Sequence, residues 1–213
     1  MNFPNLITLG RIVLALVLVP LLFIDGFGAR FTAFSIFLIA AFSDLWDGHL
    51  ARSQGMITDL GKLLDPIADK LLVAATFIPF YILSHGAESG GRFPWFGGVL
   101  PLWILVVIFG RELFITLFRG YAARRGVVLA AGRAGKYKAV FQNISIGAGI
   151  LWYALQSKAR ADGWDGAIWR GWESFHYAFA VVVLAVAVLL TVYSLVIYLR
   201  SFSGLDLRTP PES

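Results

Sequence analysis

Four aspartates stand in a part of the chain that is otherwise strongly apolar: Asp44, Asp47, Asp65 and Asp69. An ionised carboxylate at membrane depth is unfavourable unless it meets a cation or water. On helices, the i, i+3 spacing of the first pair and the i, i+4 spacing of the second each place two carboxylates on one face. Carboxylate oxygens suit hard divalent cations, so the sequence predicts a site for one or two Mg²⁺ or Mn²⁺ ions.

The residues beside this cluster favour phosphate chemistry. Gly48 directly follows Asp47 and lets a ligand approach the backbone closely, and Arg52 stands one turn later, where it can meet a phosphate. Two divalent ions bridged by carboxylates are a known device for phosphoryl transfer. Intramembrane acids also mark ion and proton pathways, so a small ion-coupled carrier is the alternative.

The composition sets the environment of these acids. The chain has 213 residues, 58% of them hydrophobic and 15% charged, with a mean hydropathy of +0.75. Those values are typical of an integral membrane protein, and the length allows about six spans of roughly 20 residues. With no cysteine, thiolate metal sites are excluded. We expect a single all-α membrane domain over residues 1–213, with a short disordered tail at about 203–213.

Apolar runs predict six transmembrane helices. The acidic pairs fall at the ends of the second and third spans that share one membrane face, where a short connection brings them to the same depth. We therefore expect a polar active-site cavity at that face. The six spans are Leu6–Ile24, Phe31–Ala51, Leu63–Leu83, Val99–Phe118, Val140–Leu155 and Phe175–Leu199.

Basic residues predict the orientation. They concentrate between the fourth and fifth spans, which places this segment, both termini and the cavity on the cytoplasmic side of the cell (inner) membrane. This bias and attraction to anionic lipid account for the net charge of +5, and nucleic-acid binding is not expected. The segment Ser157–Ser174 is expected to be a loop on the opposite face, with Trp164, Trp169 and Trp172 as interfacial anchors.

The assembled pattern is Asp44-x-x-Asp47-Gly48-x-x-Ala51-Arg52, eight residues, then Gly61-x-x-x-Asp65-x-x-x-Asp69. It resembles the signature of the CDP-alcohol phosphatidyltransferase family at all eight fixed positions. The resemblance implies a six-helix membrane enzyme, usually a homodimer, that uses two metal ions. Such an enzyme moves a phosphatidyl group from a CDP-linked lipid to an alcohol and releases CMP.

The same resemblance implies roles for individual residues. Asp44, Asp47 and Asp65 would ligate the metals, whereas Asp69 would ligate one metal and act as the general base on the acceptor hydroxyl. A second set would contact the CDP part of the lipid substrate. Its members are Asn5, Thr8, Gly48, Ala51, Arg52, Thr58 and Gly61.

Further runs are similar to the phosphatidylglycerophosphate synthases within that family, namely Asn5–Arg11, Asp65–Lys70, Arg111-Glu112 with Arg119, and Gly135–Lys138. The implied substrates are CDP-diacylglycerol and glycerol 3-phosphate. An arginine inside an apolar span is either paired or aimed at an anion, and Glu112 could orient Arg111 toward the acceptor phosphate. The predicted phosphate pocket consists of Arg111, Arg119, Arg133, Lys136 and Lys138.

One position departs from that subgroup. Ala139 stands where a hydroxyl residue often follows the second lysine. Inositol phosphate synthases of the same family also use basic clusters, so inositol phosphate remains the alternative acceptor. An ion carrier would leave Gly48 and Arg52 without a role.

Overall fold

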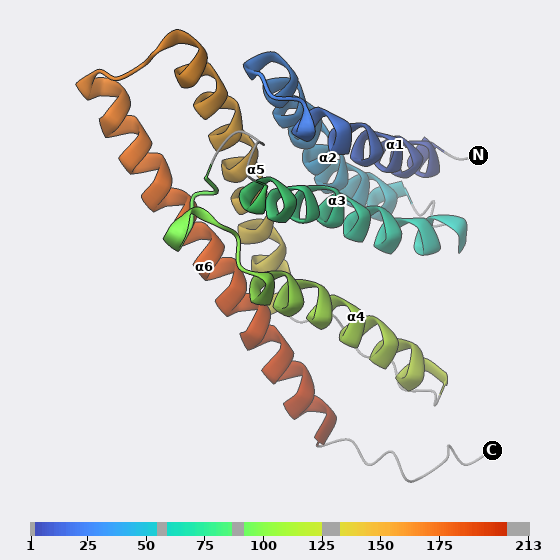
Figure 1. Cartoon of the computed structure of the whole chain (residues 1–213). Coiled ribbons are helices and arrows are strands. Elements are labelled where there is room, and N and C mark those ends of the chain that lie inside the picture. The colour runs from blue at the N-terminus through green and yellow to red at the C-terminus, as the bar shows by residue number, and fades with distance from the viewer. Residues whose placement is uncertain (1–2, 55–58, 87–91, 125–132, 204–213) are drawn as a thin grey trace, which may run out of the picture. The chain divides into compact units, whose positions relative to one another are not determined.

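The computed structural model describes residues 3–54, 59–86, 92–124 and 133–203. Within those ranges, the side chains of 3–4, 44–54, 59–63, 123–124, 133–134 and 201–203 lie outside the description. The described chain consists of helices and their connections, without a strand, which confirms the all-α class (Figure 1). Its elements are α1 (Phe3–Phe23), α2 (Phe27–Gln54), α3 (Asp59–His85), the 3-10 turn η1 (Phe96–Gly98), α4 (Leu102–Arg124), α5 (Arg133–Asp162) and α6 (Ala167–Ser203).

The helices follow the apolar runs of the sequence. Each predicted span coincides largely with one helix, and most helices extend beyond the span. Three described stretches are long and apolar enough to cross a membrane: Asn5–Phe23, Leu64–His85 and Ala167–Arg200. A shorter apolar stretch covers Phe27–Ser43. The chain is therefore a membrane protein, and the crossing of the membrane by all six helices stays a prediction. The predicted disordered tail lies almost wholly outside the described residues.

The expectation of a loop over Ser157–Ser174 is wrong. Helix α5 continues to Asp162 and α6 begins at Ala167, so helical structure covers most of that segment. At the end of α5, Lys158 Nζ lies 2.8 Å from Asp162 Oδ2 at an i, i+4 spacing, so the two charges form an ion pair along the helix. The sequence pattern failed here because it took the loss of apolar residues as the end of the helix.

The turn between α5 and α6 is set by Gly163. Its φ of 67° is in the left-handed region, which a glycine adopts without a Cβ penalty. The Trp164 N–H donates to the Ala159 carbonyl at 2.9 Å, the hydrogen bond of a Schellman helix end. Helix α5 therefore stops at a defined C-cap, and the chain turns directly into α6.

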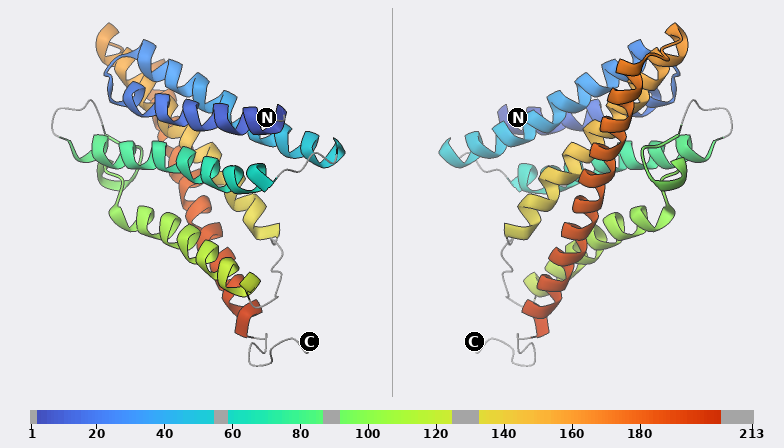
Figure 2. Two further views of the ribbon diagram at one scale, coloured as in Figure 1. Left: turned by 90° about the vertical axis from the view of Figure 1, so that its right-hand side faces the viewer. Right: turned by 90° about the vertical axis from the view of Figure 1, so that its left-hand side faces the viewer.

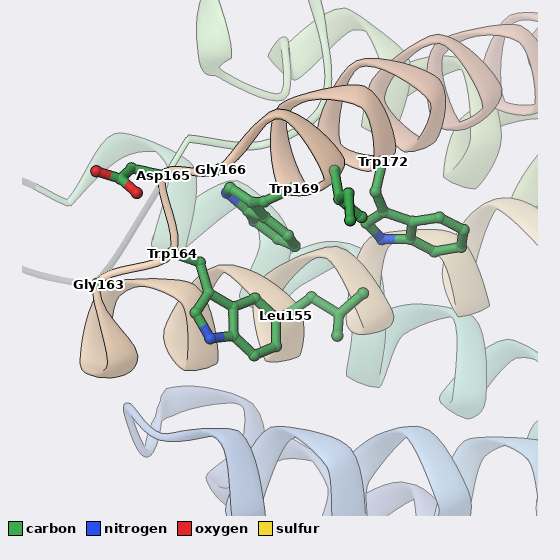
Figure 3. Close-up of a pocket in the computed structure, with 8 residues that line it drawn as sticks. Leu155, Gly163, Trp164, Asp165, Gly166, Trp169 and Trp172 are labelled. Carbon is green, nitrogen blue, oxygen red and sulfur yellow. The ribbon is translucent and has the colours of Figure 1, made fainter.

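Beside this turn lies an open hollow of about 700 Å³. Figure 3 shows the indole rings of Trp164, Trp169 and Trp172 around it, together with Leu155, whereas the Asp165 carboxylate points away. Trp164 and Trp172 are exposed, as interfacial anchors would be. Their contact with the membrane interface stays a prediction. The complete lining is Leu155, Gly163, Trp164, Asp165, Gly166, Ile168, Trp169 and Trp172.

The chain divides into two compact units, Met1–Leu100 with Ile146–Val181, and Pro101–Ser145 with Val182–Ser213. In the first unit, α1 packs against both α2 and α3, and Figure 2 shows these three helices side by side. A small residue allows α5 to approach α3 closely, because a Cβ on Gly149 would lie only 2.8 Å from the ring of Phe80. That ring stacks on Tyr153 with a centroid distance of 5.8 Å.

A buried arginine ties the start of α2 to α5 in the same unit. Arg30 Nη1 lies 2.8 Å from Asp25 Oδ1 and donates to Ser157 Oγ at 2.5 Å. Its guanidinium also lies over the ring of Tyr153, 5.4 Å from the centroid. Arg160 meets the same Asp25 oxygen at 3.2 Å. Asp25 follows the end of α1, so this cluster fixes the α1–α2 connection against α5.

The second unit contains α4, the first part of α5 and the last part of α6. Aromatic contacts join α4 to α6. The ring of Phe118 meets that of Tyr198 edge-on at a centroid distance of 5.6 Å, and the Arg119 guanidinium lies over the same tyrosine ring at 5.8 Å. These contacts position the polar cluster described below.

Candidate active site

Two side-chain pairs connect α1 to the acidic face of α3. Thr8 Oγ1 donates to Asp65 Oδ1 at 2.7 Å, and Arg11 Nη2 forms an ion pair with Asp69 Oδ1. The partners are three residues apart on α1 and four apart on α3, which is about one turn on each helix. We call Thr8–Asp65 and Arg11–Asp69 the α1–α3 pairs. Together they fix how the acidic face of α3 is turned toward α1.

The two sides of these pairs differ in exposure. Arg11 and Thr8 are buried, with 4% and 1% of their surface exposed. Asp69 is 55% exposed and Asp65 is also exposed. The carboxylates are therefore accessible to a ligand, whereas the groups that hold them lie inside the protein. Asn5, another predicted nucleotide contact, is buried one turn before Thr8 on the same helix.

The rest of the predicted acidic motif is described through its backbone. Helix α2 contains Asp44, Asp47, Gly48, Ala51 and Arg52, but their side chains lie outside the description. Gly61 belongs to the first turn of α3, and Thr58 lies outside the described residues. The convergence of all four carboxylates on one volume therefore stays a prediction, as do the nucleotide contacts.

The described part of the donor set fits a hard divalent cation. Asp65 and Asp69 offer oxygen ligands one turn apart on α3, which is the ligand type that Mg²⁺ and Mn²⁺ prefer. Among the described side chains, no group of three potential metal ligands is found. The side chains of Asp44 and Asp47 lie outside the description. Two of the four predicted ligands thus have suitable chemistry and exposure.

A second polar cluster lies in the other unit. Arg111 Nη1 lies 2.8 Å from Glu112 Oε1, and the Lys138 ammonium contacts the same oxygen. All three side chains are largely buried, with 13%, 23% and 8% of their surface exposed. One carboxylate therefore brings a cation of α4 together with a cation of α5. The expectation that Glu112 orients Arg111 agrees with this geometry.

Ser194 of α6 completes the cluster. Its Oγ accepts from Arg111 Nε at 3.1 Å and from Arg111 Nη2 at 2.6 Å. The guanidinium is thus held from two helices, by Glu112 on its own helix and by Ser194 on α6. A Cβ on Gly135 would lie 3.9 Å from Arg111 Nη2, so the start of α5 passes close to the guanidinium. The arginine has one defined orientation.

The structure brings together two of the five residues predicted for the acceptor phosphate, Arg111 and Lys138. Arg119 instead lies over the ring of Tyr198, and the Lys136 side chain is exposed. Arg133 begins α5, and its side chain lies outside the description.

The sequence assigned no role to two residues that the structure places in these clusters, Arg11 and Ser194. The sequence does indicate a role for Arg11, because an arginine within an apolar helix requires a partner. Its spacing of three residues from Thr8 also places both on one helix face. Ser194 had a weak signal, since serine is common within apolar helices, where it often bonds to its own helix backbone. Its contact with α4 depends on tertiary packing.

Comparison of the chain with known proteins identifies its family. The model of a family described as CDP-alcohol phosphatidyltransferase matches residues 1–193. The chain belongs to the CDP-alcohol phosphatidyltransferase family. This confirms the resemblance of the acidic motif, and it favours an enzyme over an ion carrier. CDP-alcohol phosphatidyltransferases generally use divalent metal ions, which agrees with the carboxylate donors on α3.

Several relatives are similar over most of their length. A probable phosphatidylglycerophosphate synthase of Mycobacterium tuberculosis (strain ATCC 25618 / H37Rv) is 36% identical over 211 residues, covering 96% of this chain and 85% of the relative. A CDP-diacylglycerol–glycerol-3-phosphate 3-phosphatidyltransferase of Bacillus subtilis (strain 168) is 32% identical over 194 residues, covering 82% and 93%. An Arabidopsis thaliana phosphatidyltransferase of the same name, number 2, is 30% identical over 203 residues, covering 93% and 78%.

Proposed function

We propose that this chain transfers the phosphatidyl group of CDP-diacylglycerol to glycerol 3-phosphate, giving phosphatidylglycerophosphate and CMP. The observation that carries this proposal is the similarity over 96% of the chain to a relative named probable phosphatidylglycerophosphate synthase. The names of the Bacillus and Arabidopsis relatives state the same reaction. The paired cations Arg111 and Lys138 support an acceptor that carries a phosphate.

The transfer requires a base. The acceptor's hydroxyl oxygen forms a bond to the phosphorus that carries the diacylglycerol, and the bond from that phosphorus to the CMP oxygen breaks. Asp69 accepts the hydroxyl proton as the new bond forms, and CMP leaves with the electron pair of the broken bond. The exposure of this carboxylate supports the assignment, because a base must be within reach of the hydroxyl.

Four carboxylates would hold two divalent ions, Mg²⁺ or Mn²⁺: Asp44, Asp47, Asp65 and Asp69. When bound, such ions stabilise negative charge on the transferred phosphoryl group and on the attacking and leaving oxygens. Thr8 contributes by donating a hydrogen bond that orients the Asp65 carboxylate. The nucleotide part of the lipid would meet Asn5, Thr8, Gly48, Ala51, Arg52, Thr58 and Gly61.

The phosphate of the acceptor would bind the cationic cluster of the second unit. Glu112 and Ser194 hold the Arg111 guanidinium in place, and its remaining N–H groups would donate to the phosphate. Lys138 adds a second cation beside it. Arg119, Arg133 and Lys136 are proposed to complete the pocket.

We place the enzyme in the cell (inner) membrane as a six-span homodimer, with both termini and the active site on the cytoplasmic side. The positive charges between the fourth and fifth spans support this orientation. Labelling of single introduced cysteines tests it, since the chain has no cysteine of its own. In a Lys136→Cys variant, a membrane-impermeant thiol reagent should react from the cytoplasmic side alone.

An acceptor panel tests the proposed reaction. Purified protein in mixed micelles with CDP-diacylglycerol and Mg²⁺ should release CMP with glycerol 3-phosphate, and chelation of the metal should stop the release. Inositol phosphate, inositol and serine should give little product. Release with inositol phosphate in preference to glycerol 3-phosphate would reassign the acceptor within the family, and no release with any alcohol would overturn the proposal.

A variant tests the acceptor pocket separately. Arg111→Ala should raise the KM for glycerol 3-phosphate by about 10-fold or more, because a charge-assisted contact with the acceptor phosphate is lost. The KM for CDP-diacylglycerol should change much less. Equal changes in both constants would remove Arg111 from the acceptor site.

A further inference from the structure

The pairing of Arg11 with Asp69 indicates a role for Arg11. This arginine lies outside the acidic motif, and the relatives' names say nothing about it. Arg11 lies in the first half of α1, a helix apolar enough to cross a membrane. Its side chain is 4% exposed, so its charge is withdrawn from solvent and requires a counter-charge within the protein. That counter-charge is the carboxylate proposed as the general base.

The exposure of this pair is strongly one-sided. The guanidinium is buried and fixed by packing, whereas the Asp69 carboxylate is 55% exposed. A buried guanidinium has few alternative rotamers, so it acts as a fixed point to which the exposed carboxylate is attached. The contact at Oδ1 therefore restricts the rotation of a side chain that would otherwise sample several orientations on the surface of α3.

The neighbouring pair strengthens this restraint. Thr8 holds Asp65 one turn away on the same two helices, at 2.7 Å. With both α1–α3 pairs formed, neither helix can rotate about its axis without breaking at least one contact. Helix α1 thus controls the direction of both described carboxylates of the motif.

We propose that Arg11 is a positioning residue, which holds the Asp69 carboxylate in the orientation that proton transfer and metal ligation require. The inference rests on the proposed function, since it gives Arg11 its effect through the base. It extends that function by placing a required residue on α1, outside the acidic motif. Arg11 itself need not touch either substrate.

Two substitutions at position 11 and one matched control test this proposal. Arg11→Met keeps the length of the side chain but removes the charge, and Arg11→Lys keeps the charge but removes the planar fork. Arg30→Met is the control, because Arg30 is also buried and also pairs with an aspartate, in a cluster without motif residues. Each protein is assayed for CMP release, for Mn²⁺ binding without substrate and for its thermal unfolding midpoint.

Arg11→Met should lower kcat by about 100-fold, the effect expected of a misplaced catalytic group, and change either KM by less than about threefold. Its affinity for Mn²⁺ alone should fall by about 10-fold, as for other residues that orient a metal ligand. Arg11→Lys should recover part of kcat. Arg30→Met should keep kcat and Mn²⁺ affinity within about twofold of the unsubstituted protein.

Three results would overturn the inference: an unchanged kcat in Arg11→Met, tighter Mn²⁺ binding by that variant, or an equal loss of kcat in Arg30→Met. The last result would mean that any buried arginine of this kind supports activity through folding alone. Failure of the proposed function is distinguishable from all three, because the unsubstituted protein would then release no CMP with any acceptor.

Discussion

Two arginine–aspartate pairs in the first unit are almost identical in burial. Arg11 and Asp69 are 4% and 55% exposed, and Arg30 and Asp25 are 0% and 58% exposed. In both, a buried guanidinium holds a carboxylate that reaches the surface. The burial of the two partners therefore does not distinguish the pair proposed for catalysis from the other pair.

The surroundings separate them. Asp69 shares the α3 face with Asp65, within a motif that matches a family of metal-using enzymes. Around Asp25 lie Ser157 and the second cation Arg160, groups that satisfy the carboxylate within the protein. Both carboxylates are ion-paired, but Asp69 has a second acid one turn away, whereas Asp25 has a second cation. Neighbouring acids favour the binding of a cation, so the second acid on α3, and not the burial of the arginine, supports the proposed role of Asp69.

Removal of the two carboxylates should give the largest contrast. Asp69→Asn should lower kcat by about 1,000-fold, within the range for the loss of a general base. Asp25→Asn should leave kcat within about threefold, because its cluster contacts no substrate. Single-turnover CMP release on folded, monodisperse protein measures both. Comparable losses in the two variants would remove the distinction between the pairs.

The arginine of the structural cluster should contribute mainly to stability. Arg30→Ala leaves a cavity in a fully buried position and removes the hydrogen bond to Ser157, so the free energy of unfolding should fall by about 3 kcal/mol. Reversible SDS unfolding in lipid–detergent micelles measures this change. A loss below about 0.5 kcal/mol would show that the cluster does not hold α2 against α5.

Each pair has a neighbouring hydroxyl group. The hydroxyl of Thr8 should affect activity, whereas that of Ser157 should affect stability. Thr8→Val removes the bond to Asp65 while keeping the side-chain shape, and should lower kcat/KM by about 10-fold. Ser157→Ala should leave kcat/KM unchanged and lower the free energy of unfolding by about 1 kcal/mol. Steady-state kinetics and SDS unfolding of both variants check this. An activity loss in Ser157→Ala would contradict the comparison.

The smallest effect is expected at Arg160. Its contact with Asp25 joins two side chains that are 43% and 58% exposed. Arg160→Ala should therefore change the free energy of unfolding by about 0.5 kcal/mol at low salt, and the difference should vanish at high salt. Unfolding at two ionic strengths measures it. A salt-independent loss would mean that Arg160 is a core member of the Arg30 cluster.

The sequence predicted the parts of this molecule that depend on local pattern. Apolar runs located the helices, and the spacing of Asp65 and Asp69 placed both on one helix face. The turn at Gly163 was missed because the loss of apolar residues was taken as the end of the helix, whereas α5 continues through Lys158 and Asp162. Hydropathy identifies apolar helices, whereas a helical segment rich in polar residues lacks that pattern.

The partners of the motif were harder to predict. Asp69 was identified from the motif, but its contact with Arg11 spans 58 positions in the chain and depends on how α1 packs against α3. The bonds from Arg111 to Ser194 cross 83 positions. A single sequence indicates which polar side chains in apolar helices need a partner. The identity of each partner depends on how the helices pack.

A double-mutant cycle on kcat tests most directly whether Arg11 acts through Asp69. Single-turnover CMP release is measured for Arg11→Met, Asp69→Asn and the double variant. If Arg11 works by orienting Asp69, the double variant should be no slower than Asp69→Asn within about twofold, because the oriented group is already gone. Losses that multiply, so that the double variant is slower by the product of the single effects, would contradict the account.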